Sequence, residues 1–178
     1  FLSCYAAEKQ LYLQMFNKGL LSENAYHLLN HDIDLEIDLM RYHSAVTGKT
    51  PIGVMRKSYL KFIHALASIP GFAKLADTFK INELISEYEE KWGLHQGSTS
   101  VLNHLDEIAK LESINDSAVT VVRQCFQSWL EATKRHLDEA AEQFPEFVTD
   151  MQDRLARRLL LNAKIETIVH QAKSGILQ

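Results

Sequence analysis

Apolar residues recur along this chain at three- and four-residue spacing, and runs of alternating apolar and polar residues are nearly absent. Such spacing is typical of amphipathic helices, whereas alternation would indicate strands. The few glycines and prolines fall where one helix would end and the next begin. We therefore predict an all-α fold, either a helical bundle or an irregular helical array, of about seven to eight helices with short connections. The predicted helices span approximately residues 3–18, 23–46, 51–68, 72–79, 82–92, 100–111, 116–143 and 145–174.

Residues with known capping preferences define several of these boundaries. Gly19 is expected to take the left-handed conformation that follows a helix C-terminus. Ser22 and Asn115 are expected to act as N-caps, because their side chains can accept hydrogen bonds from the first turn. Pro145 is expected at the first position of the last helix.

The stretch from Gly93 to Ser98 contains two glycines and is the most loop-like part of the sequence. It predicts a boundary between an N-terminal helical part, residues 1–92, and a C-terminal helical part, residues 93–178. One continuous domain is the alternative.

The helix predicted over residues 23–46 has two distinct faces. Its apolar face is expected to pack inward and its charged face to contact water or a partner. The apolar residues are Leu29, Ile33, Ile37 and Met40. The charged and polar residues are His27, His31, Asp34, Asp38 and Arg41, and the neighbouring Asp32 and Glu36 are also read as surface carboxylates.

Composition and charge exclude several classes of protein. The 178 residues are 46% hydrophobic and 24% charged, which suits a globular protein of one domain or two small ones. A net charge of −4 argues against a nucleic-acid-binding protein. The two cysteines are far apart, so no cysteine-rich zinc site is expected. No signal peptide and no membrane-spanning segment is recognised, and the start at Phe1 predicts a fragment of a longer protein.

The strongest candidate for a metal site lies on the charged face of the second helix. His27 and His31 are one helical turn apart, and Asp34 and Asp38 continue the same face, so two imidazoles and one or two carboxylates could meet one ion. The simpler interpretation is a solvated polar face, and we favour it. We therefore expect no metal ligand among these residues.

No residue is expected to be catalytic. Gly48-Lys49-Thr50 looks like the end of a phosphate-binding loop, but His43 stands where that motif requires glycine. Cys125 lies among apolar residues and is expected in the core. The aromatic stretch from Tyr59 to Phe72 is expected in the core as well, with contact to a membrane surface or a partner helix as the alternative.

Several segments resemble the cytosolic region that follows the membrane domain of sodium/proton antiporters. The relatives are bacterial antiporters and the larger salt-tolerance and sperm-type exchangers. The resemblance covers about half of the chain, and its motifs are degenerate helix patterns rather than catalytic strings. The similar segments are Glu8 to Leu29, Val101 to Leu105, Trp129 to Leu137 and, above all, Phe144 to Gly175.

The resemblance implies a cytosolic regulatory or dimerisation module of a monovalent cation/proton antiporter, at the cytoplasmic face of the cell membrane. It implies neither catalysis nor a cofactor here, because the ion-binding carboxylates of that family lie in the membrane domain. The implied partners are the chain's own transmembrane antiporter domain, a second copy in a homodimer and, in some members, a following cyclic-nucleotide-binding domain. The eight histidines offer a means of sensing pH. Two alternatives remain open: a stand-alone helical interaction domain, such as an adaptor or effector, and a metal-binding helical protein that uses His27 and His31.

Overall fold

The computed structural model describes residues 1–47 and 73–174, with the side chains of residues 1–42, 85–142 and 144–174. Within these ranges the chain forms five α-helices and no strand. They are α1 (Leu2–Asn17), α2 (Glu23–Thr47), α4 (Ala73–Leu111), α5 (Asp116–Gln143) and α6 (Pro145–Lys173). The all-α prediction is confirmed, but the predicted number of seven to eight helices is not matched. The helix predicted over residues 51–68 lies outside the described residues.

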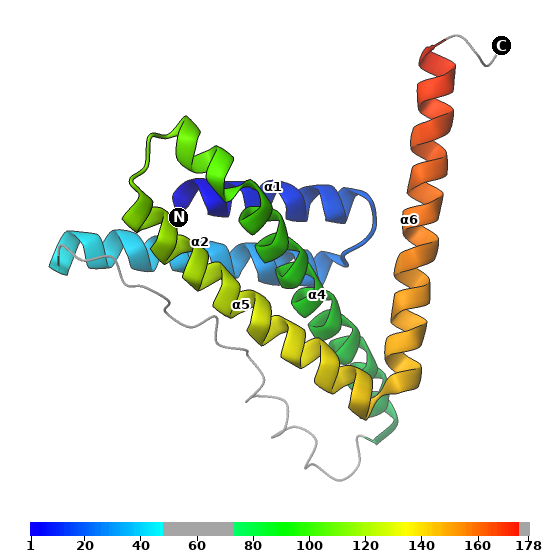
Figure 1. Ribbon diagram of the computed structural model, residues 1–178. Coiled ribbons are helices and arrows are strands. Elements are labelled where there is room, and N and C mark those ends of the chain that lie inside the picture. Colours follow the sequence, from blue (N-terminus) through cyan, green and yellow to red (C-terminus); the bar gives the residue numbers. More distant parts are fainter. Residues whose placement is uncertain (48–72, 175–178) are drawn as a thin grey trace.

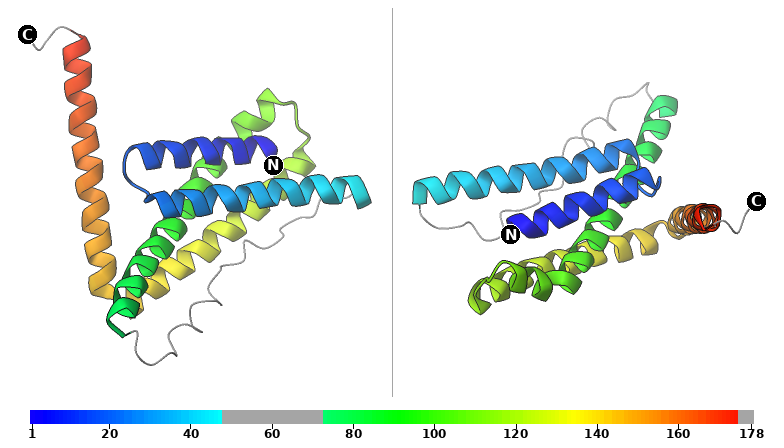
Figure 2. Two further views of the ribbon diagram at one scale, coloured as in Figure 1. Left: turned by 180° about the vertical axis from the view of Figure 1, so that it is seen from behind. Right: turned by 90° about the horizontal axis from the view of Figure 1, so that it is seen from above.

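The first four described helices form two layers. Helices α1 and α2 lie side by side in opposite directions, and the antiparallel pair α4 and α5 crosses them (Figures 1 and 2). Helix α4 contacts α1, α2 and α5, so it is the central element. Helix α6 leaves the end of α5 at a sharp corner and extends beyond the two layers (Figure 1).

The turn between α1 and α2 is closed as the sequence predicts. Gly19 has φ +65, and its N–H donates to the carbonyl of Phe16 over 2.8 Å. The N–H of Leu20 donates to the carbonyl of Met15, also over 2.8 Å. This pair of hydrogen bonds is the Schellman motif, in which glycine takes the left-handed conformation without steric cost. Ser22 accepts from the N–H of Ala25 over 3.3 Å and caps α2.

Helices α5 and α6 begin where the sequence predicts. Asn115 Oδ1 accepts from the N–H of Ala118 over 2.8 Å, so Asn115 is the N-cap of α5. Phe144 alone separates α5 from α6, and Pro145 is the first residue of α6. Proline lacks an N–H and disfavours the helical conformation of the preceding residue, so α5 cannot continue straight through this point.

The loop predicted over Gly93 to Ser98 is wrong, because these residues lie inside α4. The helices predicted over residues 72–79, 82–92 and 100–111 are one helix, Ala73–Leu111. Both glycines serve close packing instead of a turn. A Cβ atom at Gly93 would lie 2.7 Å from Leu29 Cδ1, and one at Gly97 would lie 2.5 Å from Tyr12 Oη. The predicted boundary after residue 92 thus falls within a continuous helix, and the division into two parts stays a prediction.

The core lies between the two layers. On α2, Leu29, Ile33 and Met40 are buried and Ile37 is partly buried, which confirms the predicted apolar face. The predicted charged face is confirmed as exposed at His27, His31, Asp34, Asp38 and Arg41. Glu36 is an exception, because its side chain is buried. An aromatic group from α1 and α5 adds to this core. Tyr5 and Phe126 are buried in it, and Trp129 packs against it with its ring centre 4.8 Å from that of Phe126.

Candidate functional site

Three of the four residues considered for a metal site lie close to separate charged neighbours. His27 Nε2 lies 3.7 Å from Glu23 Oε1, Asp34 Oδ1 lies 2.5 Å from Lys9 Nζ, and Asp38 Oδ1 lies 3.9 Å from Arg41 Nη1. Within residues 1–47 and 73–174, no three His, Cys, Asp or Glu side chains converge as a metal site requires. The described geometry therefore offers nothing that favours the metal-binding alternative.

Both cysteines are free thiols that belong to the interior. Cys4 lies on α1 and Cys125 on α5, and each is buried. Burial raises the pKa of both thiols, and the nearby carboxylate of Glu36 adds to the effect at Cys125. A protonated, buried thiol is a poor nucleophile. Cys125 is thus a core residue, as predicted. The segments Gly48-Lys49-Thr50 and Tyr59 to Phe72 lie outside the described residues.

The most specific polar arrangement joins α6 to the turn between α1 and α2. Arg158 Nη1 donates to the carbonyl of Gly19 over 2.6 Å, and Asn162 Nδ2 donates to the carbonyl of Lys18 over 2.8 Å. Lys18 Nζ lies 2.8 Å from Glu166 Oε1. Arg158, Asn162 and Glu166 follow one another at four-residue spacing, so they share one face of α6. We call these three side chains, with Lys18 and Gly19, the polar clasp.

The polar clasp uses groups that the end of a helix leaves open. The last carbonyls of a helix have no partner within the helix itself. Those of Lys18 and Gly19 follow α1 and accept hydrogen bonds from α6. A basic side chain at this position is also favoured by the negative end of the α1 dipole. The clasp therefore recognises the C-terminal end of α1 through its backbone.

Glu89 of α4 connects the polar clasp to the body. Its side chain is buried, and Oε2 accepts from the N–H of Ser22 over 2.8 Å. Its other oxygen, Oε1, lies 4.0 Å from Arg158 Nη1. Glu89 thereby binds the start of α2 and attracts the guanidinium of α6, so three helices and one turn meet at this point.

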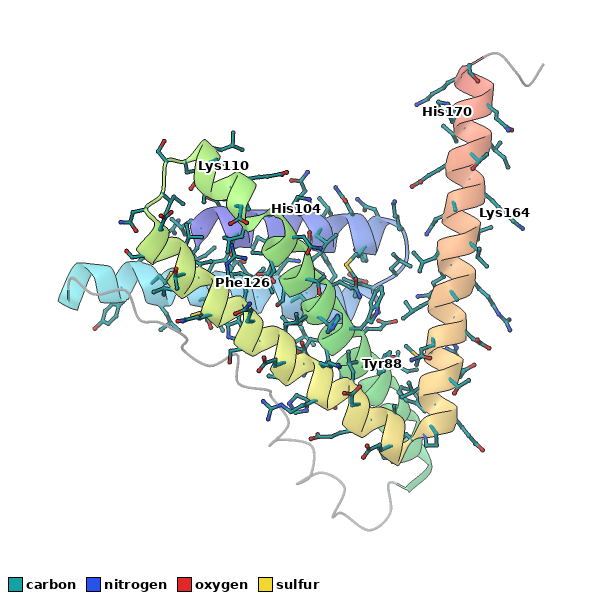
Figure 3. The ribbon with its side chains drawn as sticks, viewed as in Figure 1. Tyr88, His104, Lys110, Phe126, Lys164 and His170 are labelled. Carbon is teal, nitrogen blue, oxygen red and sulfur yellow. The ribbon has the colours of Figure 1, made fainter. Side chains whose placement is uncertain are left out.

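A cavity of about 380 Å³ lies nearer to the start of α6 than the polar clasp does, where α6 meets α4 and α5. Its lining combines apolar and aromatic side chains with a histidine, a carboxylate and two amides. The apolar and aromatic residues include Tyr88, Trp92, Leu137, Val148 and Leu155, and the polar residues are His95, Gln96, Asp138 and Gln152. In Figure 3, Tyr88 lies near the base of α6.

His95 is the titratable group of this cavity with a shifted pKa. Burial lowers the pKa, and the positive charge of Lys134 on α5 lowers it further. The carboxylate of Asp138, also on α5, acts in the opposite direction but does not overcome these two effects. The histidine is therefore neutral over a wider pH range than a free imidazole.

The segment that forms α6 was predicted from the sequence, but the polar clasp was not. The signal was the four-residue spacing of Arg158, Asn162 and Glu166, which places three polar groups on one face. Their partners could not be recognised from the sequence, because these are backbone carbonyls of Lys18 and Gly19, about 140 residues earlier in the chain.

Comparison of the chain with protein families, curated proteins and solved structures found no match. In the described part of the chain, no helix has the length and hydrophobicity needed to cross a membrane.

Proposed function

We propose that this chain is a cytosolic regulatory module of a monovalent cation/proton antiporter, in which α6 relays a signal between the body and the rest of the protein. The observation that carries the proposal is the attachment of α6. This helix, which includes most of the segment with the strongest resemblance to the antiporter tail, is packed at its base, clasped in its middle and free of the body at its end.

The two attachments of α6 differ in strength. At the base, Val148, Met151 and Leu155 are buried, and each buried aliphatic side chain contributes about 1.5–3 kcal/mol. The polar clasp is partly exposed, and an exposed hydrogen bond or ion pair contributes only about 0.5–1 kcal/mol. The clasp can therefore open while the base stays packed.

Such an arrangement has two states separated by a small free-energy difference. A signal that favours one state by a few kcal/mol changes the population strongly. In our proposal the two states are α6 clasped to the turn after α1 and α6 released from it. His95 in the cavity beneath the clasp supplies one input, since its protonation adds a positive charge opposite Lys134. Subunit contact in a homodimer, or a ligand in a following cyclic-nucleotide-binding domain, would supply others.

The proposal is tested first by the coding sequence upstream of Phe1 and then by transport. We expect a series of hydrophobic segments, each about 20 residues long, directly before this chain. In everted membrane vesicles, removal of the chain from the parent protein should change the pH dependence of cation/proton exchange. A reading frame without membrane spans would contradict the proposal.

A stand-alone helical interaction domain is the second candidate, because α6 exposes several large aliphatic side chains. They are Leu159, Leu160, Leu161, Ile165, Ile168 and Val169. This candidate would be favoured by a complete reading frame that encodes no membrane segment.

A further inference from the structure

The second half of α6 carries an exposed aliphatic stripe that none of the described helices covers. Leu161, Ile165 and Ile168 are 58%, 49% and 56% exposed, and Ala172 continues the series. Their spacing of four, three and four residues places them on one face of the helix. The clasp residues Arg158, Asn162 and Glu166 point to the body from a neighbouring face, so the stripe stays open while α6 is clasped.

The part of α6 from Arg154 to its end is basic, although the chain as a whole has a net charge of −4. Between Arg154 and Lys173 there are five Lys or Arg residues and one acidic residue, Glu166. That carboxylate is already paired with Lys18. Arg157 and Lys164 lie seven residues apart along one edge of the stripe, and neither forms an ion pair within the described residues. Lys164 projects from α6 on the side away from the body (Figure 3).

These charges favour one of two possible binding partners for the stripe, a second copy of α6 or an anionic surface. A second copy of α6 that paired along residues 157–173 would bring Arg157 and Lys164 against equally basic flanks, because the one carboxylate of that stretch, Glu166, is already bound to Lys18. Like charges at such flanking positions destabilise helix pairs. An anionic surface has the opposite effect, because each basic residue close to it adds favourable attraction.

We propose that the second half of α6 binds the surface of bilayers that contain anionic lipids. The helix would lie along the interface with Leu161, Ile165 and Ile168 among the acyl chains. Arg157, Lys164 and Lys173 would reach the head groups, as long basic side chains do at the edge of an apolar stripe. This inference does not depend on membership of an antiporter, because it concerns the chain by itself.

Flotation of the purified 178-residue chain with lipid vesicles tests the proposal. We expect binding to vesicles of equal parts phosphatidylglycerol and phosphatidylcholine, and none to pure phosphatidylcholine. Salt at about 0.5 M should release the protein, because it screens the attraction. Replacement of Leu161, Ile165 and Ile168 by Ser should weaken binding by at least about tenfold, since three apolar contacts with the acyl chains are lost.

Two further variants distinguish binding through this stripe from non-specific hydrophobic adsorption. The triple variant L2S/L13S/L35S removes leucines of similar exposure, 56%, 45% and 47%, from α1 and α2, and it should bind as the wild type does. The double variant R157Q/K164Q should weaken binding to anionic vesicles by about tenfold or more. Circular dichroism would verify that each variant is folded.

Three outcomes would overturn the proposal. They are no binding to anionic vesicles, equal binding to both vesicle types, and equal loss in the two serine variants. Sedimentation that shows a dimer abolished by L161S/I165S/I168S, without vesicle binding, would assign the stripe to a second copy instead.

Discussion

The side of α4 that carries Gly93 and Gly97 lies against α1 and α2 at the centre of the molecule. The two glycines face different neighbours. Next to Gly97 are Tyr12 and Glu8, which are buried and hydrogen-bonded to each other over 3.0 Å. Next to Gly93 are the ends of two leucine side chains.

We expect Gly97→Ala to destabilise the protein by up to about 2 kcal/mol. Alanine improves helix propensity by up to about 1 kcal/mol, but its Cβ atom would lie 2.5 Å from Tyr12 Oη, and overpacking costs about 1–3 kcal/mol. Gly93→Ala is the matched control and should cost less, because the nearest atom is the flexible end of Leu29. Urea unfolding measures both. A Gly97→Ala variant as stable as the wild type would show that α4 can move away from α1.

Ser113 gives a prediction of opposite sign. It follows α4 with φ 54, and the N–H of the next residue, Ile114, donates to the carbonyl of Ala109 over 3.0 Å. This is the same turn as at Gly19, but with a side chain in the left-handed conformation. Ser113→Gly should therefore raise the free energy of unfolding by about 1 kcal/mol, and Gly19→Ala should lower it by a similar amount. Thermal unfolding tests the pair, and stabilisation by Gly19→Ala would be inconsistent with this turn.

At the scale of the elements, α6 is the helix whose position depends on the fewest contacts. The polar clasp holds its middle, so we expect R158A/N162A to release it while Val148, Met151 and Leu155 keep its base packed. Spin labels at Gln10 and His170, in a background without native cysteines, would report the separation of α1 and α6. The distribution of distances between the two labels should be narrow in the labelled protein with an intact clasp and broad in the labelled R158A/N162A variant.

The neighbouring variant R157A is the control for this experiment, because Arg157 is exposed and, by helical spacing, lies on a different face of α6 from the clasp residues. It should leave the distribution narrow. A distribution that is equally broad in all three proteins would show that the clasp does not hold α6.

The cavity at the base of α6 gives a pH dependence with a defined sign. Burial and Lys134 hold the pKa of His95 below its usual value of 6.5, so the unfolded chain binds this proton more readily than the folded chain. The stability that depends on neutral His95 is present above pH 6.5 and is lost as the pH falls through the lowered pKa. His95→Gln should therefore reduce the loss of stability between about pH 7.5 and pH 5.5. Urea unfolding at both values, with His31→Gln as an exposed control, checks this, and an unchanged loss in His95→Gln would refute it.

The structure also indicates which elements the sequence could predict. Helices α1, α5 and α6 begin and end close to the expected residues, because Gly19, Asn115 and Pro145 act locally and their preferences need no tertiary contact. Gly93 and Gly97 misled the prediction, because a glycine that permits close helix packing looks like a glycine that ends a helix. Local sequence does not distinguish the two without knowledge of what lies opposite.

The candidate site was less predictable than the fold for a similar reason. Arg158 and Asn162 bind backbone carbonyls, which every residue has, so no partner residue type could reveal the contact. Glu36 was predicted to be a surface carboxylate, because it belongs to the alternating acidic residues of α2. Its side chain is buried, because the helices pack against it in a way that the sequence does not specify. In contrast, the charged face of α2 was recognisable, because its residues share a helical periodicity.

At the scale of the whole molecule, two packed layers support a helix that is firmly attached only at its base. In our account, the body fixes the turn after α1, Glu89 and the clasp hold α6 against it, and the exposed end of α6 is available to a membrane surface. Release of the clasp would then change the position of α6 without unfolding the body. The free energy involved is small enough for a change of pH or of subunit contact to supply.

The most direct test is cation/proton exchange by the proposed parent protein in everted vesicles, measured across pH with the variant R158A/N162A. The control is R135A, which removes an exposed arginine of α5 that lies outside the polar clasp and outside the stripe of α6. Our account predicts that R158A/N162A changes the rate several-fold at some pH values, that is, shifts its pH profile at equal amounts of protein in the membrane, while R135A does not. Identical pH profiles for the three proteins, or a parent protein that exchanges no cation, would contradict it.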